Sequence, residues 1–91
     1  MAKPAIGMIE TKGLAALVVA ADAMLKSAAV EFIGWKKVGG GLCSGYIQGD
    51  VAAVRTALDA GVAVARETGQ VVASQVLSRP HDEVQAMLPK R

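Results

Sequence analysis

The sequence predicts an α+β fold, with a four-stranded antiparallel sheet, two main helices and a short C-terminal helix. Its 91 residues are the length of one domain, so we expect a single domain over residues 1–91. Short β-type runs alternate with two longer segments of helical period, in the order β-α-β-β-α-β. Two β-α-β units joined in this way form the ferredoxin-like, split-βαβ arrangement, in which right-handed crossovers place both helices on one face of the sheet.

The first strand and helix are predicted in the N-terminal third. Residues 5–11 form an apolar run that ends at Lys12 and Gly13. A helical period then begins, with larger apolar residues on one stripe and alanines on another, so this helix is expected to pack on both sides. Asp22 and Lys26 lie four residues apart, in the order that favours an ion pair on a helix. The larger apolar stripe contains Leu14, Leu17, Val18, Ala21, Met24 or Leu25, and Ala28.

A Gly-rich hairpin is predicted in the middle of the chain. Residues 30–38 contain aromatic and β-branched residues and read as a strand, and residues 42–48 read as the next strand. Three consecutive glycines at 39–41 join the two strands, which are therefore expected to pair antiparallel.

The C-terminal half repeats the helix and strand order. Asp50 is a good N-cap residue, and a helix is predicted from there to Thr68 and Gly69. Its apolar stripe contains Val51, Val54, Leu58, Gly61 or Val62, and Ala65. Residues 70–77 are valine-rich and read as the fourth strand, and a short helix is expected over 81–88.

Composition predicts assembly and excludes several partners. Hydrophobic residues make up 53% of the chain, mostly Ala and Val, which is more than a small monomer buries and suits flat contacts between subunits. The net charge of +2 is too small to predict nucleic-acid binding. No apolar run approaches the roughly 20 residues that span a bilayer, and no signal peptide is evident. A single cysteine fits a reducing compartment, so we expect a cytoplasmic protein without membrane or nucleic-acid partners.

The sequence offers little for catalysis. His81 is the one histidine and Cys43 the one cysteine. We expect His81 to be an exposed cap at a helix start and Cys43 to be a thiol in the core of a strand. No catalytic residue, metal site or cofactor is predicted. One alternative stays open, in which symmetry gathers several copies of Cys43 around an axis to hold a cluster.

The triple glycine after Lys37 and Val38 leaves two interpretations open. It is either a plain hairpin turn or a loop whose bare amides hold an anion, beside the lysine. It does not have the spacing of a Walker A motif, and it precedes a strand rather than the helix of a dinucleotide fingerprint.

Several separated segments resemble one protein family. They are GMIETKG at 7–13, AADAMLKSA at 20–28, KVGGGL at 37–42, GDVAAV at 49–54 and RPH at 79–81. Together they resemble the single-domain, hexamer-forming shell proteins of bacterial microcompartments, over nearly the whole chain from Ala5 to Lys90. The GGGLC run at 39–43 is most similar to ethanolamine-utilisation shell proteins, and the opening is equally similar to propanediol-utilisation and carboxysome shell proteins.

The resemblance implies a structural role inside a cytoplasmic microcompartment. The family forms flat hexamers that tile into a shell around enzymes, so the implied partners are further copies of the chain, other shell proteins, the enclosed enzymes and small polar metabolites. The loop after the second strand forms a central pore in this family. That implies pore-lining roles for Lys37, Val38, Gly39, Gly40 and Gly41, with Gly40 at the constriction.

The family pattern also implies edge contacts between hexamers, at Lys26 and Arg79. Many relatives have serine where Gly40 stands, so a slightly wider pore without a hydroxyl is expected. Two alternatives are kept: a ferredoxin-like regulatory module that binds a small molecule or an anion, and an electron-transfer shell subunit with a cluster near Cys43.

Overall fold

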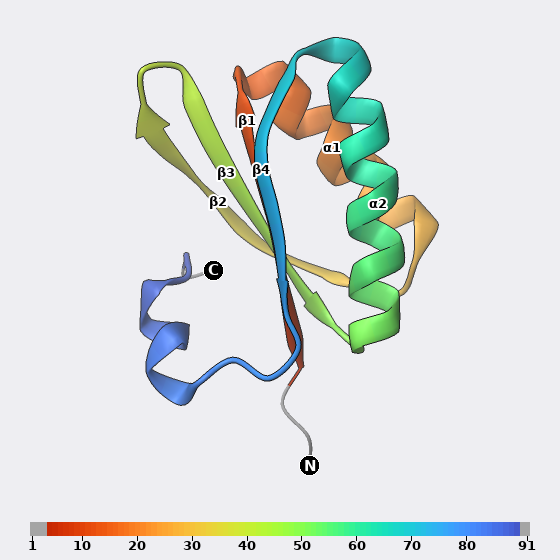
Figure 1. Cartoon of the computed structure of the whole chain (residues 1–91), viewed down its shortest axis with the longest axis vertical. Helices are drawn as coiled ribbons and strands as arrows, with labels where there is room; N and C mark the ends of the chain where they lie inside the picture. Colours follow the sequence, from red (N-terminus) through yellow and green to blue (C-terminus); the bar gives the residue numbers. More distant parts are fainter. Residues whose placement is uncertain (1–3, 90–91) are drawn as a thin grey trace.

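The computed structural model describes residues 4–89 and confirms the predicted α+β fold (Figure 1). The predicted domain runs over residues 1–91, of which 1–3 and 90–91 lie outside the described residues. A terminal 3-10 helix, η1, occupies the place of the predicted C-terminal helix. The elements in chain order are β1 (Ala5–Lys12), α1 (Leu14–Ser27), β2 (Glu31–Gly39), β3 (Leu42–Gly49), α2 (Val51–Thr68), β4 (Gln70–Leu77) and η1 (Asp82–Met87).

The four strands form one antiparallel sheet in the order β2-β3-β1-β4. Strands β3 and β1 are therefore central, and β2 and β4 form the two edges. Helices α1 and α2 both cover the same face of the sheet (Figure 1). This arrangement is the one that right-handed β-α-β crossovers require.

The main core lies between the helices and the sheet. Alternate residues of the central strands, such as Ile9 and Ile47, point into it and are fully buried. The opposite face of the sheet carries a smaller cluster, in which Ile6, Ile33 and Leu88 are buried. Leu88 follows η1, so the C-terminal segment covers part of the sheet face that the helices leave open (Figure 1).

Both ends of α2 agree with the sequence prediction. The Asp50 side chain accepts a hydrogen bond from the Ala52 amide at 3.1 Å, which satisfies one of the free amides of the first turn. At the other end, the Gly69 amide donates to the Ala65 carbonyl at 2.8 Å. Helix α2 therefore begins after Asp50 and ends before Gly69, as the sequence predicted.

The packing face of α1 differs from the predicted stripe. The buried residues are Ala16, Leu17, Ala20 and Met24, whereas Leu14, Val18 and Leu25 are 46%, 57% and 48% exposed. The cause is the close approach of α2, because a Cβ atom added to Gly61 would lie 2.6 Å from Met24 Cγ and 3.2 Å from the Ala20 carbonyl oxygen. Small residues fit this crossing, which leaves three large apolar side chains of α1 outside.

Candidate functional site

The β2–β3 connection is a two-residue turn formed by Gly40 and Gly41. Gly39 and Leu42 are the last paired residues of the two strands. The φ angles are 113° at Gly39, 62° at Gly40 and 83° at Gly41, a region that residues with a Cβ atom rarely adopt. Type I′ turns require positive φ at both central residues, and their backbone twist matches the right-handed twist of the two strands of a hairpin. The predicted antiparallel hairpin is confirmed, and its conformation requires glycine within a single chain.

The glycine hairpin, residues 39–41, is exposed at one end of the sheet. All three glycines are exposed, and a Cβ atom added to any of them would meet no atom within 4 Å. In Figure 1 the hairpin projects at the upper end of β2 and β3, on the opposite side of the sheet from α2. The tip therefore has the room to contact a ligand or another subunit.

Two lysines precede the hairpin and point to different faces of the sheet. Lys36 is opposite Ser44, which lies on the open face, and its Nζ donates a hydrogen bond to the Met87 carbonyl at 2.5 Å. Lys37 is opposite Cys43, whose side chain lies in the core on the helix face, so Lys37 emerges at the edge on that side. Lys37 and Val38 are both exposed beside the hairpin. The five consecutive residues predicted to line a pore, 37–41, are all exposed in the single chain.

The two predicted edge residues lie on different elements. Lys26 is in the last turn of α1, where its Nζ lies 2.8 Å from Asp22 Oδ2, and the two side chains are 75% and 61% exposed. Arg79 follows β4 and is exposed. Within one chain Lys26 pairs with Asp22, as the i to i+4 spacing predicted.

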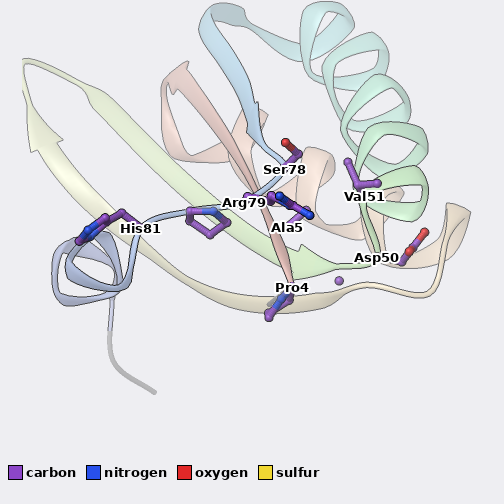
Figure 2. Close-up of a pocket in the computed structure, with 9 residues that line it drawn as sticks. Pro4, Ala5, Asp50, Val51, Ser78, Arg79 and His81 are labelled. Atoms are coloured by element: carbon purple, nitrogen blue, oxygen red, sulfur yellow. The ribbon is translucent and has the colours of Figure 1, made fainter. Parts of the chain in front are cut away.

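Arg79 lies in an open groove of about 860 Å³ that three separate segments create (Figure 2). The groove lies where β1 begins, where α2 begins and where the chain leaves β4. It is lined by Pro4, Ala5, Gly49, Asp50, Val51, Ser78, Arg79, Pro80 and His81. Sequence reasoning did not predict this groove, although two of its segments belong to the motifs GDVAAV and RPH.

His81 and Cys43 occupy the ordinary positions expected for them. His81 is exposed at the start of η1, and its Nδ1 accepts a hydrogen bond from the Glu83 amide at 3.1 Å. Cys43 is 4% exposed and belongs to the main core. Over residues 4–89, no group of three or more His, Cys, Asp or Glu side chains is placed to hold a metal ion. No helix in that range is long and apolar enough to cross a membrane.

Comparison with known proteins finds one family. The family model described as "BMC domain" matches residues 5–80. The bacterial microcompartment shell protein PduA of Citrobacter freundii is 52% identical over 90 residues, which cover 99% of this chain and 97% of the relative. The bacterial microcompartment shell protein EutM of Escherichia coli (strain K12) is 49% identical over 85 residues, covering 93% and 88%.

A solved structure shares the fold. The crystal structure of a microcompartments protein from Desulfitobacterium hafniense DCB superposes with a TM-score of 0.85 at 36% sequence identity. The match covers 94% of this chain and 48% of the solved one, so this chain spans about half the length of that protein.

Proposed function

This chain belongs to the BMC domain family of bacterial microcompartment shell proteins, and we propose that it forms flat cyclic hexamers that tile edge to edge in a shell facet. The observation that carries the function is the family match over residues 5–80, together with near full-length similarity to shell proteins. The chain is accordingly a structural subunit of a microcompartment shell and not an enzyme.

The exposed apolar residues support a ring. Leu14, Val18 and Leu25 of α1 are about half exposed, and Trp35 on the β2 edge is 44% exposed. On the opposite edge, Val72 of β4 is 45% exposed. Because the two edges differ, a contact between them joins one patch to another, and repetition of such a heterologous contact closes a ring when the rotation fits.

The glycine hairpin is proposed to line the central pore. Six copies meeting at an axis would present glycine backbone amides, with Gly40 at the narrowest point and Lys37 and Val38 beside it. The structure supports this role because the hairpin is exposed and nothing in its own chain fills the space beyond each glycine Cα. Backbone dipoles and a ring of lysines select permeants by charge, so small polar and anionic metabolites are favoured.

Lys26 and Arg79 are proposed to contact neighbouring hexamers. Lys26 has a long flexible stem, and its side chain is 75% exposed. Its ion pair with Asp22 is a surface pair, which is typically worth about 0–1 kcal/mol, so Lys26 can exchange this partner for a group on the next hexamer. Arg79 is exposed in the open groove, which has room for a side chain from the neighbouring hexamer. The wider partners proposed are other shell proteins, the enclosed enzymes and the permeating metabolites.

Particle mass and electron microscopy test this function together. Light scattering should give the mass of six chains, and negative staining should show sheets or tubes of hexamers. Monomers or dimers without ordered sheets would contradict the proposal. A small oligomer that phosphate or another anion stabilises would instead favour the anion-binding regulatory module, for which the exposed glycine amides beside Lys37 are the supporting feature.

Purified protein also distinguishes the electron-transfer alternative. A cluster at the axis would give colour and bound iron. The burial of Cys43 in the core of its own subunit argues against that alternative, because a thiol that is 4% exposed does not reach a shared axis without rearrangement.

A further inference from the structure

We propose that Thr11 and Gly13 are positioning residues that hold the glycine hairpin in place, so that the proposed pore has a rigid rim rather than a flexible gate. This inference deepens the proposed function and rests on it. It concerns the segment ETKG at 10–13, which the shell function leaves without a role.

The glycine hairpin needs support from outside itself. Pairing between β2 and β3 ends at Gly39 and Leu42, so Gly40 and Gly41 lie beyond the ladder. Neither glycine has a side chain to pack, and the space around their missing Cβ atoms is empty. The conformation of such a turn therefore depends on the pairing of its own two strands and on hydrogen bonds from other segments to its backbone.

Gly13 supplies such a bond. Its amide donates to the Gly41 carbonyl at 2.7 Å. Since Lys12 and Leu42 are the last residue pair between β1 and β3, this bond adds one rung beyond the end of that ladder. In Figure 1 the start of α1 and the hairpin lie at the same end of the sheet.

The conformation of Gly13 explains why glycine stands before α1. Gly13 is the N-cap of that helix, a position that Ser, Thr, Asp or Asn commonly occupies, yet no side chain caps this helix. Its φ angle is 96°, in the region that favours glycine. The backbone can therefore turn from β1 into α1 while the Gly13 amide still faces the hairpin.

Thr11 fixes the other side of Gly13. Its hydroxyl donates to the Gly13 carbonyl at 3.1 Å, and its side chain is fully buried. A buried hydroxyl needs a partner, because losing its bonds to water without replacement is costly. The pairing of β1 with β4 shifts register between Glu10 and Thr11, so Thr11 lies at a local irregularity of the strand. Gly13 is thus bonded through its carbonyl to Thr11 and through its amide to Gly41.

Hydrogen–deuterium exchange measured by mass spectrometry tests the positioning role. Thr11→Val keeps the shape of the side chain and removes the hydroxyl, whereas Thr11→Ser keeps the hydroxyl. We expect Thr11→Val to speed exchange in peptides over residues 10–17 and 38–44 by about five- to tenfold, the loss expected for one hydrogen bond. Thr11→Ser should restore the slow exchange, and peptides of α2 should be unchanged in both variants.

Ser44→Ala is the matched control. Ser44 is the other buried polar residue in the described part of the chain, and its hydroxyl lies 3.0 Å from the Tyr46 hydroxyl on the open sheet face. Removal of this hydroxyl in Ser44→Ala should leave the exchange rate of the β1–α1 peptide (10–17) unchanged. The positioning role would be overturned if the hairpin peptide (38–44) still exchanged slowly in Thr11→Val. It would also be overturned if Ser44→Ala raised the exchange rates of the 10–17 and 38–44 peptides equally.

Particle mass, measured on the same samples, separates this inference from the proposed function. If the protein forms hexamers and Thr11→Val leaves the exchange rate of the hairpin peptide unchanged, the positioning role is overturned and the proposed ring stands. A response to Thr11→Val in a chain that forms no ring would support the bonded hairpin and overturn the rigid pore rim.

Discussion

Replacing Gly40 by alanine tests whether the hairpin conformation requires glycine at that position. The φ angle of 62° places Gly40 in the left-handed region, which costs a residue with a Cβ atom about 1–2 kcal/mol. No steric penalty is added within the chain, because the new Cβ atom would meet nothing within 4 Å. Alanine also restricts the unfolded chain, which offsets about 0.4–1 kcal/mol of the cost.

The expected net result for Gly40→Ala is a loss of about 1 kcal/mol in the free energy of unfolding. For a domain of this size, that loss lowers Tm by about 4–8 °C. Thermal unfolding followed by circular dichroism measures the shift. All samples must have the same protein concentration, because assembly raises Tm by mass action.

Gly40→Asn is the matched comparison for this prediction. Asparagine tolerates the left-handed region better than alanine, so its Tm should lie closer to that of the unaltered protein. An unchanged Tm for Gly40→Ala, or equal losses for both variants, would refute the conformational argument. In hexamers the asparagine side chain would also stand at the proposed constriction, and should therefore slow permeation even though the subunit remains stable.

Three further variants test other parts of the structure. Lys26→Ala should leave hexamers intact by light scattering and change the free energy of unfolding by about 0–1 kcal/mol, but it should weaken the sheets seen by negative stain. Lys26→Arg should retain more sheet formation than Lys26→Ala. Loss of the hexamer in Lys26→Ala would contradict the edge role. Asp50→Ala should lower the urea unfolding free energy by about 0.5–2 kcal/mol through loss of the α2 cap, while a similar loss in Asp50→Asn would argue against capping. Gly7→Ala should cost about 1–3 kcal/mol, because the new Cβ would lie 2.8 Å from Val54 Cγ1 and 2.9 Å from Ile47 Cγ1, and unchanged thermal stability would contradict this packing argument.

Local patterns predicted most of the fold. The β4 range of 70–77, the Asp50 cap and the two-strand hairpin follow from residue periodicity, capping chemistry and glycine placement, which act over a few neighbours in the chain. Such short-range effects can be read from the residues themselves. The burial of Cys43 and the exposed position of His81 also agreed with the simplest interpretation of each residue.

The sequence by itself determined the order of the elements, the family resemblance and the need for a special backbone at residues 39–41. The tertiary structure decided which face of α1 is buried, because that depends on how closely α2 approaches at Gly61. It also decided that the Gly13 amide meets the Gly41 carbonyl, 28 positions along the chain, since that contact depends on the register of β1 against β3. Contacts of this kind are set by packing among distant segments, which no local period of side chains specifies.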